Sequence, residues 1–217
     1  MIKNSIYSYE YSQPEDYKFS LDSVFLAQKV AQALKIDHPQ DLSELKVLDL
    51  CAGSGVIGLE LNFHLPEISK IDFLEIQDQY IEHFNLNKTQ AANHSQFRFL
   101  HMNYEELTGV DHNSEFYNSY DVIVSNPPYF FMGEGLLSPN EFKNRCRFFI
   151  DSSFKKLIEA MLSSLKPNGI SYFLVRPGKN HGRDILGEVR NLTMGSAAVD
   201  FFDEIRGTAI VRLIKKS

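Results

Sequence analysis

Apolar residues along the chain are concentrated in short runs and in longer stretches with helical spacing. The runs at 46–50, 70–76, 96–101, 120–125 and 170–175 have the length and composition of buried strands. Helical spacing dominates at 21–34, 56–63, 78–92 and 152–165. Two further runs, 199–205 and 208–214, are separated only by Arg206 and Gly207, which predicts a hairpin. Strands and helices are therefore predicted to alternate until this final hairpin.

This order of elements predicts an α/β fold. Parallel strands joined by right-handed crossover helices form a doubly wound sheet with helices on both faces. The hairpin adds one antiparallel strand, so the seven runs predict a seven-stranded, mostly parallel sheet. Without a repeat, linker or low-complexity tract, residues 1–217 are expected to form a single domain.

Composition narrows the functional classes only slightly. A net charge of −6 lowers the expectation of a nucleic-acid partner, because phosphates usually meet a basic surface. The two cysteines, Cys51 and Cys146, and the seven histidines show no metal-ligand spacing, so no metal is expected. No stretch approaches the ~20 apolar residues of a membrane span, and the N-terminus lacks an apolar signal core. We expect a soluble, cytoplasmic protein.

A glycine-rich turn follows the first predicted strand, from Asp49 through Gly53 and Gly55 to Gly58. Between a parallel strand and a helix, such a turn lies at the carboxyl edge of the sheet and lets a ligand approach the backbone. The next strand ends at Glu75, whose carboxylate can accept hydrogen bonds from both hydroxyls of a ribose. These features favour a nucleoside-containing ligand over a merely tight turn.

Two nucleoside ligands fit this segment. Gly53, Gly55 and Gly58 satisfy the GxGxxG spacing of dinucleotide binders, in which the helix N-terminus carries a pyrophosphate. Asp49, directly before the turn, would repel a pyrophosphate. A sulfonium ligand needs no phosphate site, so Asp49 favours S-adenosylmethionine as the cofactor. A nicotinamide-binding oxidoreductase is the alternative from a different class.

The fourth predicted strand runs directly into Asn126, Pro127, Pro128 and Tyr129. Two prolines cannot continue a central strand, and they make the loop rigid. The Asn126 side-chain oxygen and the Pro127 carbonyl could accept both N–H groups of an adenine amino group or a glutamine amide. The nitrogen lone pair, localised in this way, would attack the methyl group on sulfur in line, and the nitrogen would lose its proton afterwards. Tyr129 would stack on the substrate. The alternative is a rigid turn without catalytic function, in which Asn126 only caps the loop. The predicted place of this loop beside the glycine turn favours N-methyl transfer.

The segments Asp49 to Gly58 and Asn126 to Tyr129 together resemble class I methyltransferases that modify amino nitrogens of adenine, guanine or glutamine. Upstream, the segment from Tyr17 to Ala27 resembles the cofactor-closing segment of bacterial tRNA (adenine-N6)-methyltransferases. Downstream, Phe130 to Gly133 and Asn144 to Arg147 resemble the residues after the motif in that group. The resemblance implies a closing segment at 1–44, a Rossmann-like core at 45–217, and methylation of adenine N6 in a tRNA anticodon loop.

The resemblance also defines the candidate site. The expected cofactor-binding residues are Phe19, Ser20, Asp22, Asp49, Cys51, Ala52, Gly53, Gly55, Glu75, Ile76, Asn103, Tyr104 and Asn126. Two of them depart from the family pattern, since Cys51 replaces the first glycine of the turn and Asn103 precedes Tyr104 where an acid is usual. Candidate substrate contacts are Phe130, Lys143, Arg145 and Arg147, although the three cations are equally compatible with a solvated face.

Two further interpretations of the acceptor are open. The acidic charge favours a protein glutamine amide, but enzymes of that kind generally carry an extra helical N-terminal domain. Only about 40 residues precede the first predicted strand, fewer than a separate domain needs. A non-catalytic RNA-binding protein is the other alternative. The polar loop at 179–183 is one more candidate for substrate contact.

Overall fold

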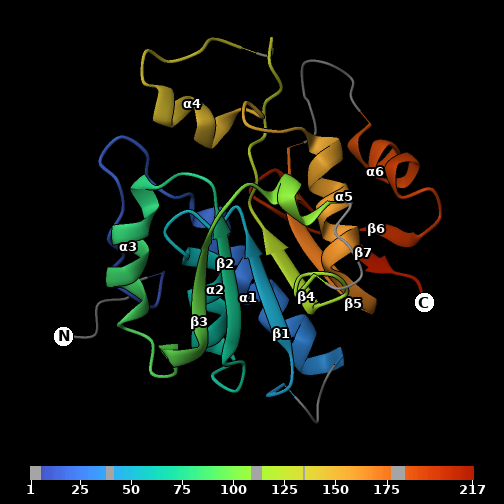
Figure 1. The fold of residues 1–217 in the computed structure, drawn as a ribbon, viewed down its shortest axis with the longest axis horizontal. Coiled ribbons are helices and arrows are strands. Elements are labelled where there is room, and N and C mark those ends of the chain that lie inside the picture. The colour runs from blue at the N-terminus through green and yellow to red at the C-terminus, as the bar shows by residue number, and fades with distance from the viewer. Residues whose placement is uncertain (1–5, 38–41, 109–113, 134, 177–183) are drawn as a thin grey trace.

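The computed structural model describes residues 6–37, 42–108, 114–133, 135–176 and 184–217. A seven-stranded sheet runs through the centre of the molecule (Figure 1). Its strands are β1 (Lys46–Leu50), β2 (Lys70–Glu75), β3 (Phe97–His101), β4 (Tyr120–Ser125), β5 (Leu165–Val175), β6 (Ala197–Ile205) and β7 (Thr208–Lys215). The order is β3-β2-β1-β4-β5-β7-β6, and β7 is antiparallel to both of its neighbours while the other described pairs are parallel. The predicted mostly parallel sheet is confirmed.

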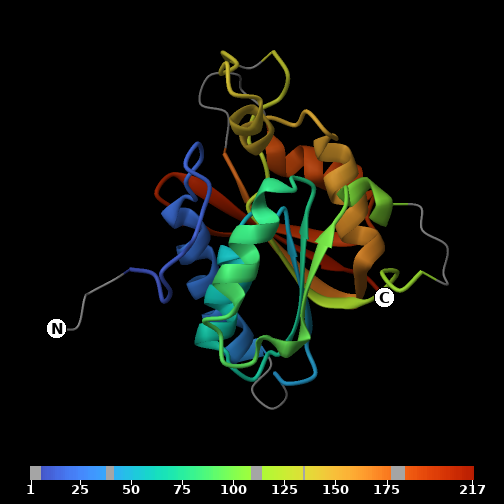
Figure 2. The same cartoon turned by 60° about the vertical axis from the view of Figure 1, so that its left-hand side comes forward.

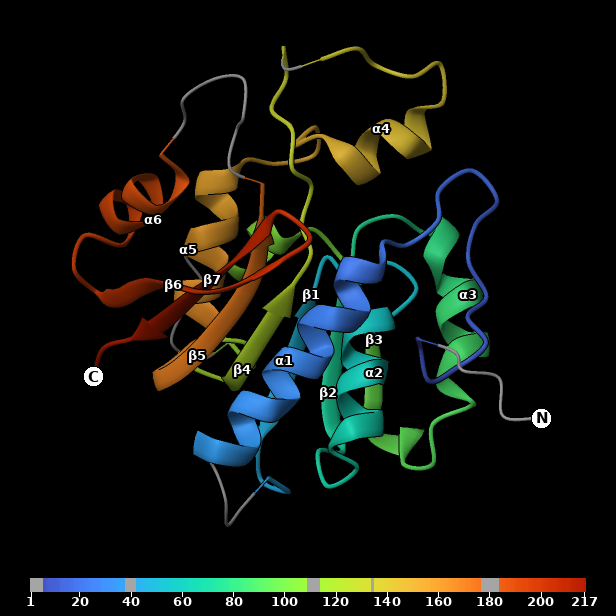
Figure 3. The ribbon, with the colours of Figure 1, turned by 180° about the vertical axis from the view of Figure 1, so that it is seen from behind.

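Helices cover both faces of the sheet, as Figures 2 and 3 show. One face carries α1 (Leu21–Asp37), α2 (Val56–His64) and α3 (Gln79–Lys88), and the other carries α5 (Phe154–Ser164) and α6 (Ile185–Thr193). Each layer has its own apolar core, centred on Leu26 and Phe73 on one side and on Leu157 and Phe173 on the other. Two short 3-10 helices, η1 (His94–Gln96) and η2 (Tyr104–Leu107), flank β3.

The short helix α4 (Glu141–Arg147) lies beyond the carboxyl ends of the strands (Figures 1 and 3). Because β1 and β4 are neighbours and their crossovers run to opposite sides, the reversal point of the sheet lies below α4. Ligands of open α/β sheets bind at such a point. The fold therefore places the glycine turn and the loop after β4 side by side, as predicted.

The main local difference from the sequence prediction concerns β5. It begins at Leu165, whereas the sequence predicts a helix end there and a strand only from Ile170. Tyr120 pairs with Leu165 and Val122 with Ile170, so the residues between them form an irregularity inside the strand. Asn168 has a φ of 64°, which ordinary strand residues do not adopt. The Pro-Asn-Gly signal therefore marks a bulge rather than the boundary of the strand.

Residues 6–20, here called the N-terminal strap, lie along α2 and α3. The buried Glu60 carboxylate accepts hydrogen bonds from Ser8 N at 2.7 Å and from the Tyr11 hydroxyl at 2.8 Å. Asn87 accepts one from Ser12 N at 2.7 Å. These contacts fix the strap on the helical layer and lead the chain toward the carboxyl edge of the sheet.

Candidate active site

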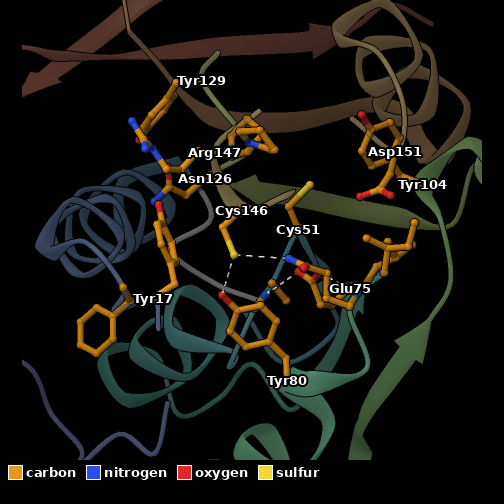
Figure 4. A pocket seen from close by; sticks show the side chains of 18 of the residues that line it. Tyr17, Cys51, Glu75, Tyr80, Tyr104, Asn126, Tyr129, Cys146, Arg147 and Asp151 are labelled. Atoms are coloured by element: carbon orange, nitrogen blue, oxygen red, sulfur yellow. Dashed lines mark hydrogen bonds between the residues drawn. The ribbon is translucent and has the colours of Figure 1, made fainter. Parts of the chain in front are cut away.

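A pocket of about 260 Å³ opens at the carboxyl ends of β1, β2 and β4 (Figure 4). Most residues expected from the sequence line it: Phe19, Ser20, Cys51, Ala52, Gly53, Glu75, Ile76, Asn103, Tyr104, Asn126, Pro127, Pro128, Tyr129, Phe130 and Arg147. They come from the strap, the glycine turn, the ends of β2 and β3, the loop after β4 and the last residue of α4. The structure thus brings the two main motifs to one cavity. Asp22, Asp49, Gly55, Lys143 and Arg145 lie outside its lining.

The glycines of the turn have two different roles, ligand access and helix packing. Gly53 lines the pocket, and a Cβ there would meet nothing nearer than Tyr80, at 3.5 Å. At Gly55 a Cβ would lie 2.8 Å from the Phe84 ring, and at Gly58 it would lie 2.4 Å from the Phe73 ring. Gly55 and Gly58 therefore allow α2 to pack closely rather than contact a ligand.

Glu75 connects the end of β2 to the glycine turn. Its Oε2 accepts a hydrogen bond from Gly53 N and its Oε1 accepts one from Gln77 N, both at 2.9 Å. Burial raises the pKa of Glu75, and these backbone donors oppose that rise. A carboxylate has about four acceptor positions, so positions remain for the two hydroxyls of a ribose.

Asp49 has a structural role that the sequence does not reveal. It is fully buried, and its Oδ2 accepts a hydrogen bond from Gly58 N at 2.8 Å. Its Oδ1 has no hydrogen-bond partner among the described residues, and burial raises the pKa of Asp49 to about 7. Asp49 holds the first turn of α2 and lies outside the pocket lining, and its expected contact with a cofactor stays a prediction.

Asp22 likewise serves the fold and lies outside the pocket lining. Its Oδ2 accepts a hydrogen bond from Thr208 Oγ1 at 3.3 Å, and Arg206 Nη1 lies 3.7 Å from its Oδ1. These contacts join the beginning of α1 to the hairpin between β6 and β7. The neighbouring Ser23 faces the pocket instead.

The Asn126 carboxamide is held from two sides. Its Nδ2 donates a hydrogen bond to Ser23 Oγ at 2.9 Å, and its Oδ1 accepts one from the Tyr129 hydroxyl. The backbone N–H groups of Tyr129 and Phe130 both donate to the carbonyl of Arg147, at 3.1 and 3.0 Å. These hydrogen bonds fix the loop after β4 on both sides of its two prolines.

Helix α4 is fastened over the pocket by Cys146. Its Sγ lies 3.3 Å from both Gln77 Nε2 and the Tyr80 hydroxyl, as the dashed lines in Figure 4 show. Burial raises the pKa of Cys146 to about 11. Arg145 forms an ion pair with Asp151 at 2.9 Å and does not line the pocket. The predicted phosphate contacts of Lys143 and Arg145 therefore have no support from their position.

Asn103 replaces the usual acid after β3 and is already hydrogen-bonded on both sides. Its Oδ1 accepts from Glu105 N at 2.9 Å and caps η2, while its Nδ2 donates to the carbonyl of Asp151 at 3.0 Å. The apolar side chains of Ile76 and Met102 line the same part of the pocket. This end can enclose a planar ring largely through apolar contact.

Several pocket residues are absent from the sequence prediction: Gln13, Tyr17, Ser23, Gln77, Tyr80, Met102, Cys146 and Arg176. Tyr17 and Ser23 belong to the segment that carries the resemblance, and Gln77 and Tyr80 closely follow Glu75, so their positions gave a signal. Cys146 lies in the segment from Asn144 to Arg147 that also carries the resemblance, whereas Arg176 follows no motif. The loop at 179–183 lies outside the described residues.

A pocket at the reversal point of this sheet, with an acid after β2 and a rigid Asn-Pro-Pro-Tyr loop after β4, defines the class I methyltransferase arrangement. The chain belongs to the methyltransferase small domain family, whose model matches residues 19–136. Members of this class use S-adenosylmethionine. The predictions of a methyltransferase domain and of its cofactor are confirmed at the level of the family, and the nicotinamide alternative is set aside.

Curated relatives of two kinds match the chain. Ribosomal protein uL3 glutamine methyltransferase of Neisseria meningitidis is 28% identical over 146 residues, which cover 64% of this chain and 44% of that protein. The tRNA1(Val) (adenine(37)-N6)-methyltransferase of Pedobacter heparinus is 32% identical over 129 residues, covering 59% of this chain and 51% of that protein. The chain thus spans about half the length of the curated relatives it matches.

Solved structures share the fold. A methylase from Haemophilus influenzae has a TM-score of 0.58 at 14% identity, covering 90% of this chain and 99% of that one. TYW2 from Pyrococcus horikoshii, solved in complex with MeSAdo, has a TM-score of 0.59 at 15% identity, covering 92% and 65%. Within the described part of the chain, no helix is long and apolar enough to cross a bilayer, and no cluster of three or more metal-binding side chains occurs.

Proposed function

We propose that the protein transfers a methyl group from S-adenosylmethionine to N6 of an adenine in the anticodon loop of a tRNA. The observation that carries this proposal is the Asn126 carboxamide, held between Ser23 and Tyr129 at the end of β4. It lines the same pocket as Glu75 and the glycine turn. A planar amine placed there would lie between an oriented acceptor and a cofactor site.

The pocket residues fit the cofactor at the other end of the cavity. Glu75 retains acceptor positions for ribose hydroxyls, Ile76 and Met102 offer an apolar contact for adenine, and Gly53 leaves the backbone accessible. The buried Asp49 carboxyl accepts a hydrogen bond from Gly58 N and so holds the start of α2 beside the turn. When bound, S-adenosylmethionine supplies an electrophilic methyl group on sulfonium sulfur.

The loop after β4 provides the two acceptors that a weakly nucleophilic nitrogen needs. Asn126 Oδ1 carries two lone pairs, of which the Tyr129 hydroxyl uses one, so the second can accept a substrate N–H. The Pro127 carbonyl would accept the other N–H, and both acceptors draw the nitrogen toward tetrahedral geometry. Their fixed position avoids reorganisation during the reaction.

The acceptor end of the pocket suits a nucleobase. Tyr17, Tyr129 and Phe130 line it, and stacking of a base on an aromatic ring is worth ~1–3 kcal/mol. The relatives named for tRNA adenine N6 support the same acceptor. The net charge of −6 and the relatives named for glutamine favour a protein amide instead, and this is the second candidate.

One labelling experiment separates these acceptors. The purified protein is incubated with methyl-labelled S-adenosylmethionine and with total RNA and total protein from a strain lacking it. Label in N6-methyladenosine from the tRNA fraction is the expected result. Label in glutamine would keep the chemistry and overturn the acceptor, and label in neither fraction would refute the proposed activity.

A further inference from the structure

Two arginines at the pocket, Arg147 and Arg176, have no carboxylate partner among the described residues. The other described arginines are engaged: Arg98, Arg145, Arg206 and Arg212 each lie within 4.0 Å of an Asp or Glu oxygen, and Arg190 donates to a backbone carbonyl. Arg147 and Arg176 are set apart by their place, since both line the pocket, whereas the other described arginines lie outside its lining. That both occur at one pocket indicates an anionic ligand there.

Both guanidinium groups are held by aromatic rings of the loop after β4. The Arg176 guanidinium lies 4.9 Å from the centre of the Tyr129 ring, and that of Arg147 lies 5.3 Å from the centre of Phe130. Contact with a ring occupies the face of a guanidinium and leaves its N–H donors in the plane free. Those donors match the oxygens of a phosphate or carboxylate.

The two arginines reach one region from separate parts of the fold. Arg147 ends α4, and its carbonyl is fixed by the N–H groups of Tyr129 and Phe130. Arg176 follows β5, the neighbour of β4. Burial raises the pKa of Tyr17, and both arginines lower it, so both cations act on the same hydroxyl group in the pocket. Figure 4 shows Arg147 beside Asn126 and Tyr129, on the side of Tyr17.

We propose that Arg147 and Arg176 clamp the phosphate adjacent to the base that accepts the methyl group. This inference rests on the proposed function and names its substrate as a nucleic acid. An oxyanion of this kind has a second possible source, the carboxylate of S-adenosylmethionine. The acceptor phosphate is favoured because the arginines contact Tyr129 and Phe130, the rings expected to face the acceptor, rather than residues beside Glu75.

The test measures binding without catalysis. Unmodified tRNA from a strain lacking the protein is titrated with wild-type protein, Arg147→Gln and Arg176→Gln, over a series of salt concentrations. Each variant should bind roughly 5- to 20-fold more weakly at ~0.1 M salt, and the slope of log Kd against log salt should fall by about 0.7–0.9 for each phosphate that is no longer neutralised. Arg190→Gln, a cation bonded to the carbonyl of Val199, is the matched control and should bind as the wild type does.

Calorimetry with S-adenosylhomocysteine distinguishes the two oxyanions. Unchanged affinity of Arg147→Gln and Arg176→Gln for S-adenosylhomocysteine supports the phosphate clamp. If the variants lose affinity for S-adenosylhomocysteine but not for tRNA, the arginines bind the cofactor carboxylate and the phosphate clamp is overturned. Wild-type tRNA affinity and salt slope in both variants, or no tRNA binding by the wild-type protein, would also overturn it. Normal tRNA binding by a wild-type protein that transfers no methyl group would refute the proposed function alone.

Discussion

Replacing Asn126 by alanine should separate the loss of chemistry from the loss of the fold. The carboxamide makes two hydrogen bonds. Its Nδ2 donates to Ser23 Oγ, and its Oδ1 accepts from the Tyr129 hydroxyl. At ~0.5–1.5 kcal/mol each, their removal lowers the free energy of unfolding by about 1–3 kcal/mol. A domain typically has ~5–15 kcal/mol, so the variant should remain folded at 25 °C.

The effect on turnover should be larger than a structural loss of this size explains. A hydrogen bond to a group that becomes charged is worth ~1.5–3 kcal/mol, which corresponds to a roughly 10- to 160-fold decrease in kcat. Because Asn126 lies at the acceptor end, the affinity for S-adenosylhomocysteine should change less than about threefold. Asn126→Asp keeps acceptor oxygens and should retain more activity than Asn126→Ala.

The assay is single-turnover methyl transfer to tRNA from the deletion strain, with cofactor affinity measured by calorimetry. A single-turnover rate constant within twofold of the wild-type value would refute the role of Asn126 as an acceptor. Equal losses of kcat, cofactor affinity and thermal stability would assign its effect to the fold. Asn126→Asp is the control for a general disturbance of the site, because it changes the same residue without removing the acceptor oxygen.

The packing and the titration of the site support three other predictions. Gly58→Ala should lower the free energy of unfolding in urea by ~1–3 kcal/mol, because the added Cβ would lie 2.4 Å from the Phe73 ring. At an ordinary helical glycine the same change raises stability by ~1 kcal/mol, and a rise in stability here would contradict the close packing of Gly58. Burial raises the pKa of Asp49 to about 7 from an unfolded value of ~3.9, so its protonated form stabilises the fold below pH ~4 and this contribution is lost as pH rises through about 7. Asp49→Asn, which keeps an acceptor for Gly58, should flatten that decline in unfolding measurements between pH 5 and 8, and an unchanged pH profile would count against the shift. Burial raises the pKa of Cys146 to about 11 and that of Cys51 well above its ordinary value, so Ellman's reagent at pH 8 should label both thiols far more slowly in the native protein than in urea; equal rates would show that the thiols are exposed.

Local signals predict the strands and the main motifs because each depends on neighbours in sequence. Leu48 and Leu50 lie in the short stretch Lys46–Leu50, in which every side chain after Lys46 is buried, as is usual for a strand of a parallel sheet. The Ile185, Val189 and Leu192 spacing is also helical, although α6 is missing from the prediction. Helix α4 has no apolar stripe, and its position depends on the contacts of Cys146 with Gln77 and Tyr80, far away in sequence.

The same reasoning explains which site residues the sequence predicts. Gly53, Glu75 and Asn126 follow strand ends, so the rule for parallel sheets places them together. Asp49 fits the motif equally well, but only the three-dimensional structure shows that its carboxylate bonds to Gly58 N. Arg176 gains its place from the pairing of β5 with β4, and no sequence spacing indicates which ring its guanidinium contacts.

The anchoring of α1 has a consequence for the order in which the molecule assembles during synthesis. Asp22 pairs with Thr208, 186 residues later, and Ser12 of the strap bonds to Asn87, 75 residues later. Contacts of such separation form late, because the connecting chain must first be made and brought together. Ser23, which accepts a hydrogen bond from Asn126, lies next to Asp22 on α1, whose apolar face packs in the core beside α2. In a nascent chain that still lacks β7, we therefore expect α1 to be packed on α2 while its N-terminal end, which carries Ser23, still lacks the contact of Asp22 with Thr208.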